Sequence, residues 1–185
     1  RAGVGASRAV RTPRISGARF ALDLKSAAGL SAPNTLGVYD SGPVANLLDY
    51  VMPFVAGESL RDKLNRETQL TIDDAIQITC EVAEALTYAH SQGVVHRDIK
   101  PANILRSGNH SLVTDFGVAK ALNAAMPSAA MTSTGMAIGT PAYMAPEHLA
   151  GDPNADHRID IYAVGLLAYG LPTGPSPFDA LSPPP

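Results

Sequence analysis

Four polar side chains of complementary chemistry lie within one short stretch of this 185-residue chain and constrain it more than any other feature. Residues 96–103 read His-Arg-Asp-Ile-Lys-Pro-Ala-Asn, and Asp115-Phe-Gly begins twelve residues after Asn103. Asp98, Lys100, Asn103 and Asp115 supply two carboxylates, an ammonium group and a carboxamide. Phosphoryl transfer from a magnesium nucleotide requires this set: a group that orients the attacking hydroxyl, a cation for the moving phosphoryl group, and oxygen ligands for Mg²⁺.

These residues match the motifs H-R-D-[LI]-x-x-x-N and D-F-G in type and order. In this respect the chain resembles the catalytic domain of the bacterial, eukaryotic-like serine/threonine protein kinases. The resemblance runs from about Arg19 to Phe178. It implies an α+β, two-lobed fold, with an incomplete small β-rich N-lobe and a mainly helical C-lobe that lacks its last helices. The expected parts are a degenerate N-lobe remnant (1–18), a partial N-lobe and hinge (19–55), a partial C-lobe with catalytic loop and activation segment (56–178), and a proline-rich tail (179–185).

The resemblance also implies a reaction, namely transfer of the ATP γ-phosphoryl group to Ser or Thr hydroxyls of proteins. Asp98 is expected to accept a hydrogen bond from the substrate hydroxyl and to take its proton late. Lys100, two residues later, is expected to contact the γ-phosphoryl group, a spacing that marks Ser/Thr kinases. Asn103 and Asp115 are the expected metal ligands, for Mg²⁺ with Mn²⁺ as an alternative.

Residues 50–55, Tyr-Val-Met-Pro-Phe-Val, resemble the hinge that binds adenine between the two lobes. Met52 is expected to guard the pocket behind adenine. The adenine edge is expected to bond the Pro53 carbonyl and the Val55 amide, and Leu105 is expected to lie beneath the ring. The ATP site is completed by Asp115.

Arg97 stands beside Asp98, where the family places an arginine that pairs with a phosphorylated activation segment through its planar fork. The candidate phosphosites are Thr132 and Thr134, and Thr140 is expected to touch Asp98 and Lys100. Ala145-Pro-Glu147 matches the motif that closes this segment. The residues expected to give structural support are Asp23, His96, Arg97, Phe116, Gly117, Glu147 and Asp160.

Both ends of the chain depart from the family pattern. Gly3-Val-Gly5 is only a fragment of the glycine loop that covers phosphates, and Arg11 is the only basic candidate near the expected strand lysine. Asp23 replaces the helical glutamate, which shortens the reach by about 1.5 Å. Gly170 stands where a glutamate usually follows the helical tyrosine, and Glu147 is expected to lack its arginine partner. We therefore expect weak or no activity and marginal stability.

Bulk properties exclude some classes of function. The net charge of −3 gives no electrostatic case for nucleic acid or an anionic membrane. The only cysteine, Cys80, precludes an internal disulfide and fits a cytoplasmic location. No apolar run is long enough to predict a membrane span, although a longer membrane-anchored kinase is the alternative setting. ATP and Ser/Thr-containing proteins are the expected partners.

Local patterns predict short strands at 36–39 and 47–54 around an Asp40-Ser-Gly-Pro43 turn, and a helix over 19–30. They predict helices at 60–66 and from a Thr71 N-cap to about Ser91, and an apolar helix at 160–171. Short β segments are expected at 94–95, 104–106 and 112–114, with a hairpin turn at 107–110. The expected buried stripe of the long helix is Ile72, Ile76, Thr79, Val82, Ala83, Leu86 and His90.

Two other classes of protein remain open. A pseudokinase would keep the fold as a nucleotide- or protein-binding module without turnover, as the missing strand lysine suggests. A small-molecule phosphotransferase of the aminoglycoside type shares the H-x-D-x-x-x-x-N loop. It lacks the lysine two residues after the aspartate and the Ala-Pro-Glu segment, both of which are present here.

Overall fold

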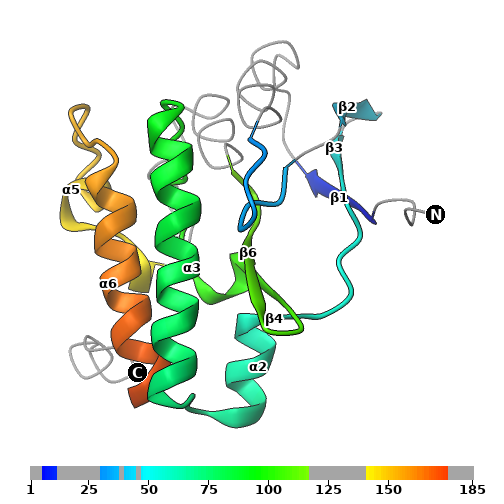
Figure 1. The fold of residues 1–185 in the computed structure, drawn as a ribbon. Helices are drawn as coiled ribbons and strands as arrows, with labels where there is room; N and C mark the ends of the chain where they lie inside the picture. The colour runs from blue at the N-terminus through cyan, green and yellow to red at the C-terminus, as the bar shows by residue number, and fades with distance from the viewer. Residues whose placement is uncertain (1–5, 12–29, 38–39, 45–46, 117–140, 175–185) are drawn as a thin grey trace, which may run out of the picture.

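The computed structural model describes residues 6–11, 30–37, 40–44, 47–116 and 141–174. Three strands near the N-terminus form a small antiparallel sheet: β1 (Ala6–Arg11), β2 (Asp40–Val44) and β3 (Leu47–Met52), in the order β1-β3-β2. β3 is central and pairs with both neighbours. In Figure 1 this sheet lies on one side of the molecule, away from the long helices, and the chain leaves it through the segment after Met52.

A second small sheet lies between the first sheet and the helices. It contains β4 (Glu58–Ser59), β5 (Ile104–Ser107) and β6 (His110–Val113), in the order β4-β5-β6. β5 and β6 form a hairpin with a two-residue turn, and Gly108 takes a left-handed φ of 58° there, which glycine adopts without a steric penalty. β4 leads directly into helix α2 (Leu60–Glu67), whose N-cap side chain, Ser59, accepts a hydrogen bond from the Asp62 amide.

Two long helices form the largest part of the fold. Helix α3 (Ile72–Ser91) begins at Thr71, whose hydroxyl accepts a hydrogen bond from the Asp74 amide at 3.1 Å. It packs beside α6 (Arg158–Thr173), as Figure 1 shows. Short elements complete the fold: the 3₁₀ helices η1 (Pro101–Asn103) and η2 (Pro141–Tyr143), and α5 (Pro146–Leu149). The core that these elements share includes Leu30, Leu60, Ile78, Val82, Leu86, Ile104, Val113, Phe116, Leu167 and Leu171.

The structure confirms the predicted helices at 60–66, 72–91 and 160–171, the Thr71 cap and the β5–β6 hairpin. It contradicts the first predicted turn, because residues 40–44 form strand β2 and residues 36–37 are not in a strand. β2 lies at the edge of its sheet, where the missing amide of Pro43 is tolerated. Residues 94–95 are not a strand either. The predicted helix over 19–30 falls almost entirely outside the described residues.

The predicted buried face of α3 was also wrong. Ile72 and Ile76 are 68% and 58% exposed, whereas the buried positions are Ala75, Ile78, Val82, Ala85, Leu86 and Ala89. The true stripe uses three alanines, which let neighbouring elements approach closely but contribute little to a hydrophobic pattern. Val82 and Leu86 belong to both stripes, so the error is a rotation about the helix axis rather than a wrong element.

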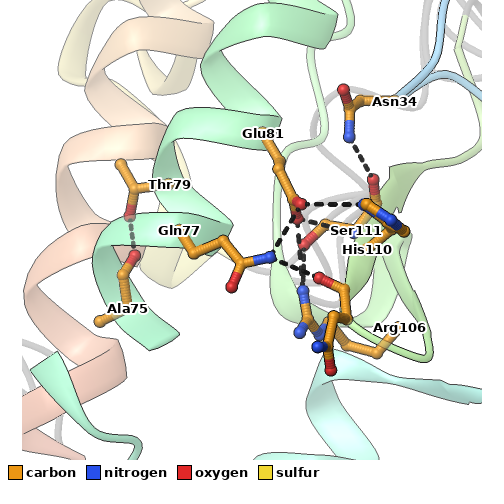
Figure 2. Close-up of polar contacts among 9 residues, drawn as sticks. Asn34, Ala75, Gln77, Thr79, Glu81, Arg106, His110 and Ser111 are labelled. Carbon is orange, nitrogen blue, oxygen red and sulfur yellow. Dashed lines mark hydrogen bonds and ion pairs between the residues drawn. The ribbon is translucent and has the colours of Figure 1, made fainter. Parts of the chain in front are cut away.

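A polar network attaches α3 to the β5–β6 hairpin (Figure 2). Glu81 on α3 accepts hydrogen bonds from the Ser111 amide at 2.7 Å and from the Arg106 guanidinium at 3.3 Å. Burial raises the pKa of the Glu81 carboxyl, yet bonds from Ser111 and Gln77 and the charge of Arg106 outweigh it, so the pKa lies below its ordinary value. The carboxylate therefore stays charged and pairs with Arg106, which is only 8% exposed.

A segment from before the first hairpin reaches the same place. Asn34 donates from Nδ2 to the Ser111 carbonyl at 3.0 Å, and Figure 2 shows this contact beside the Glu81 network. The next residue, Thr35, forms a parallel bridge to Val113. The Leu36 amide bonds the Val113 carbonyl at 2.9 Å, and the Val113 amide bonds the Asn34 carbonyl at 2.9 Å. The strand that leads to Asp115 is thus held from two sides.

Candidate active site

The residues of the 96–103 loop lie between the C-terminus of α3 and the β5–β6 hairpin. α3 ends at the cap residue Gln92, and Gly93 with φ 73° turns the chain away from the helix. The loop ends in η1, and the chain enters β5 at Ile104. Ile99 within the loop is 2% exposed and belongs to the core. Its burial fixes the position of the loop, and with it the polar residues on either side, Asp98 and Lys100.

The structure brings three of the predicted residues together. Lys100 Nζ lies 2.7 Å from Asp98 Oδ2 and 3.0 Å from Asp98 Oδ1. Asn103 Nδ2 donates to Asp98 Oδ2 at 2.9 Å and to the Asp98 carbonyl at 2.8 Å. These bonds use both amide hydrogens of Asn103 and leave its Oδ1 as an acceptor. The Asp98 side chain is 28% exposed, so the carboxylate is oriented but still reachable from outside.

Asp115 lies at the end of β6, beside the same loop. The Thr114 amide bonds the Asn103 carbonyl at 2.9 Å, which holds the two segments that carry Asn103 and Asp115 next to each other. Asp115 is 7% exposed and has a left-handed φ of 64°. Non-glycine residues rarely adopt this conformation, and in proteins it is concentrated at functional sites. Arg97, in the same region, has a φ of 70°.

Asp160 in the first turn of α6 fixes the loop backbone. Its Oδ2 accepts hydrogen bonds from the His96 amide and from His90 Nε2, and its Oδ1 accepts one from the Arg97 amide, each at 2.8 Å. Burial raises the pKa of Asp160, but the bonds from His90, His96 and Arg97 outweigh this effect and hold the pKa below its ordinary value. The left-handed backbone conformation of Arg97 is therefore stabilised by a hydrogen bond to a buried carboxylate.

His96 is fully buried and takes a defined tautomer. Its Nε2 lies 2.7 Å from the Thr114 carbonyl, which can only accept, so Nε2 carries the proton. Its Nδ1 then accepts the Asp98 amide at 3.2 Å. The ring packs against Phe116 edge to face, with centroids 4.8 Å apart. His96 thus connects the segment of Asp98 to the segment of Asp115.

Arg97 carries an unsatisfied donor. Its Nε is buried and has no hydrogen-bond partner within the part of the chain that the structure describes. A small cavity beside it is lined by Asp98, Tyr143, Asp160 and His148, among others. Burial, followed by the charge of Arg97, lowers the pKa of His148, which favours a neutral ring next to the guanidinium. An orphaned buried donor costs roughly 1–3 kcal/mol, so this site is suited to an additional acceptor.

The predicted hinge begins in the last residues of β3, and residues 53–55 after it have no regular structure. Met52, the last residue of β3, is 9% exposed, whereas Pro53 and Val55 are partly exposed. The chain then enters β4, where Ser59 pairs with Leu105 of β5, so the hinge segment leads to the strand that carries Leu105. Gly57 marks a close approach: a Cβ there would collide with the Arg106 carbonyl oxygen. Glycine is therefore required at this position.

Several predicted residues are not placed. Asp23, Gly117, Thr132, Thr134 and Thr140 lie outside the described residues. Glu147 occupies the first turn of α5 and is half-buried, and its carboxylate makes no hydrogen bond or ion pair with other described residues. Two partners were missed as site residues: His90, which was expected only as part of a helix face, and Thr114, whose carbonyl receives the His96 ring. The spacing of His90 before the loop gives no signal for its bond to Asp160, seventy residues away.

No helix of the described part is long and apolar enough to cross a membrane. The described residues also contain no cluster of three or more His, Cys, Asp or Glu side chains that could hold a metal ion. Mg²⁺ in nucleotide sites is commonly held by one or two protein oxygens together with substrate phosphates. The Asn103 Oδ1 and the Asp115 carboxylate supply hard oxygen donors of this kind.

The described residues form a small β-rich part and a mainly helical part, and residues 53–57 lead from the one to the other, which is the arrangement of a two-lobed phosphotransferase. Residues 15–183 match the family model described as a protein kinase domain, and the chain belongs to this family. The matched range extends slightly beyond both limits expected from the motifs.

Several relatives found by comparison are bacterial kinases. The chain is 40% identical over 166 residues to a probable serine/threonine-protein kinase, pknA2, of Bifidobacterium longum, covering 89% of this chain and 21% of that protein. It is 44% identical over 168 residues to the serine/threonine-protein kinase PknJ of Mycobacterium tuberculosis, covering 88% and 28% respectively. The chain therefore spans between a fifth and a third of the length of these relatives.

A solved structure shares the fold. The crystal structure of the PknI kinase domain of Mycobacterium tuberculosis aligns with a TM-score of 0.70 and 32% sequence identity, covering 91% of this chain and 61% of that chain. The prediction of an α+β kinase-like fold from the sequence is confirmed by this match, as is membership of the serine/threonine kinase family.

Proposed function

We propose that this chain transfers the γ-phosphoryl group of ATP to Ser or Thr hydroxyls of protein substrates. One observation carries the proposal: Asp98 is oriented by Lys100 and Asn103 at 2.7–3.0 Å and remains 28% exposed, with the segment of Asp115 held alongside. A carboxylate fixed in this way can accept the hydrogen bond of an incoming hydroxyl without rearranging first.

The roles of the residues follow from their chemistry. Asp98 orients the substrate hydroxyl and receives its proton as the new oxygen–phosphorus bond forms and the bond from the γ-phosphorus to the bridging oxygen breaks, which releases ADP. Lys100 places an ammonium group where the transferring phosphoryl oxygens pass, and its present contact with Asp98 keeps it within reach. Asn103 Oδ1 and the Asp115 carboxylate would hold Mg²⁺, or Mn²⁺ in its place, which supplies positive charge to the phosphate oxygens.

ATP binding is assigned to the hinge. The Pro53 carbonyl and the Val55 amide are proposed to bond the adenine edge, and the proline can serve because only its carbonyl is needed. Met52 would close the back of the adenine pocket, and Leu105 would form its floor. The partial exposure of Pro53, Val55 and Leu105 supports this role, because each is reachable by a ligand.

Arg97 is proposed to bind a phosphate on the activation segment, at Thr132 or Thr134, with Thr140 touching Asp98 and Lys100. The support is the buried Nε that has no partner among the described residues. A phosphate oxygen is the acceptor that best satisfies a guanidinium donor. Intact-mass and fragment mass spectrometry after incubation with Mg-ATP tests the assignment, and phosphate on neither threonine would remove it.

A second function is favoured by one specific feature. β1 (Ala6–Arg11) reads Ala-Ser-Arg-Ala-Val-Arg and has no lysine where the family places one to hold ATP. Arginine does not reproduce the geometry of an ammonium group. A nucleotide-binding module without turnover is therefore the alternative function. If the chain is an active kinase, we expect its activity to be weak. The use of ATP and the single cysteine, Cys80, both fit a cytoplasmic setting.

The experiment is a radiolabelled transfer assay from ATP to a Ser/Thr-rich protein acceptor, comparing the wild type with Asp98→Asn. Asp73→Asn, an exposed carboxylate on α3, is the matched control. Transfer by the wild type and by D73N that is lost in D98N supports the kinase assignment. No transfer, combined with a thermal shift on addition of Mg-ATP, supports the binding module, and equal transfer by D98N refutes the assigned role.

A further inference from the structure

A pocket of about 300 Å³ lies next to the 96–103 loop, between α2 and α6. α2 and the α2–α3 connection line one side of it, and the last two turns of α6 line the other. The loop contributes Pro101, the neighbour of Lys100, and η2 contributes Tyr143. The end of α6 is tied to this place, because the Leu70 amide bonds the Leu171 carbonyl at 2.9 Å. The pocket is thus a fixed feature beside the proposed catalytic residues.

Arg61 is the one charged side chain among the described residues that line this pocket. Arg61 is half-buried, and its guanidinium makes no ion pair or hydrogen bond with another described residue, unlike the side chains of the other two basic residues of α2. Lys63 pairs with Glu67 at 3.1 Å, and Arg66 pairs with Glu58 at 2.6 Å. α2 therefore leaves a single guanidinium unneutralised, and it is the one that faces the pocket.

The opposite wall of the pocket carries no charge to balance it. Gly170 of α6 lines the pocket, and a Cβ built there would meet no atom within 4 Å. The remaining lining is apolar or uncharged: Leu64, Asn65, Thr68, Gln69, Leu166, Leu167, Leu171, Thr173 and Gly174. A partly enclosed cation without a counter-charge attracts an anionic group and repels a basic one.

We propose that Arg61 binds an aspartate or glutamate side chain of the protein substrate, a few residues from the Ser or Thr that accepts the phosphoryl group. The inference rests on the proposed function, since it places a substrate chain across Asp98 and past Pro101 into the pocket. It names a substrate class: Ser/Thr sequences with a nearby carboxylate, selected against those with a lysine or arginine at the same position.

The test is peptide binding and phosphorylation with the full chain. A set of fluorescein-labelled peptides carries one Ser acceptor in a Gly/Ala background, with Asp, Ala or Lys at each flanking position in turn. Kd is measured by fluorescence anisotropy, and initial rates are measured with Mg-ATP on the same peptides. The variants are Arg61→Gln, Gly170→Glu and, as a matched control on the same helix but outside the pocket lining, Arg66→Gln.

The wild type is expected to bind the Asp peptide on the order of tenfold more tightly than the Ala peptide at one position, through a charge-assisted hydrogen bond. R61Q abolishes this preference, R66Q retains it, and G170E reverses it toward Lys because the new carboxylate lies in the same pocket. Circular dichroism spectra are recorded to check that each variant is folded.

The inference is overturned if no flanking position distinguishes Asp from Ala, or if the preference survives in R61Q. Its failure is separate from that of the proposed function. A binding preference without phosphate transfer retains Arg61 as an acid-recognising residue and refutes the kinase activity. Transfer that ignores the flanking charge retains the kinase activity and refutes the role of Arg61.

Discussion

The substitution Asp160→Asn probes how the 96–103 loop is held. Each carboxylate oxygen of Asp160 accepts one backbone amide at 2.8 Å, from His96 or from Arg97. Asparagine has the same shape but only one oxygen, so its NH₂ group must face one of the two amides. Leaving one buried donor without its charged acceptor costs about 1.5–3 kcal/mol of unfolding free energy.

The measurement is urea unfolding followed by far-UV circular dichroism, because the chain contains no tryptophan to report by fluorescence. Asp73→Asn, an exposed carboxylate in the first turn of α3, is the control and is expected to cost less than about 0.5 kcal/mol. If D160N loses no more than D73N, Asp160 does not hold the loop in the way described. Phosphate transfer by D160N should fall as well, since Asp98 would lose its fixed position.

The same substitution has a defined pH dependence. The pKa of Asp160 is lowered in the folded state, so its stabilising effect is present above the unfolded value of about 3.9 and is lost as pH falls through the folded value. The difference in unfolding free energy between wild type and D160N is therefore expected to narrow below about pH 4. A difference that grew on acidification would contradict the assignment.

Three further predictions concern stability. Gly57→Ala forces a Cβ against the Arg106 carbonyl, and the unfolding free energy should fall by at least about 1–3 kcal/mol in urea titrations, whereas Gly108→Ala, in open space, should cost less. Glu81→Gln removes the carboxylate that pairs with Arg106, although Nη1 of Arg106 keeps its bond to Ser111 Oγ at 2.8 Å, and should cost about 2 kcal/mol at pH 7; no loss would show that the ion pair is dispensable. The pKa of His148 is lowered, so stability should fall as pH drops below about 6.5, and His148→Gln should flatten that part of the curve.

The parts of the fold predicted correctly from the sequence are those specified by local chemistry. Thr71 caps α3 because a hydroxyl before acidic residues satisfies free amides, and this holds whatever packs nearby. The Gly108–Asn109 turn was predictable for the same reason. The structure at Asp40–Pro43 was not predictable in this way, because these turn-forming residues pair with β3 and form an edge strand. Tertiary contact overrode local preference there.

The candidate site also has a part that could be predicted from the sequence and a part that could not. Asp98, Lys100 and Asn103 lie within six residues, so their meeting could be expected from the motif. The bonds from Asp160 to His90 and to Arg97 join residues 70 and 63 positions apart, and no periodicity encodes them. The rotation error on α3 had a similar origin, because three of its buried positions are alanines, whose burial depends on how α3 packs in the fold rather than on their hydrophobic strength.

The contact of residues 34–36 with β6 has a consequence for dissecting this protein. Cutting the chain in the exposed stretch around Phe54 would give two polypeptides. These would remain bound to each other through the Asn34 side chain and the backbone hydrogen bonds at Val113. A nicked protein should therefore migrate as one particle on a sizing column. A recombinant fragment beginning after the cut would instead expose the flank of β6, an open edge that invites self-association.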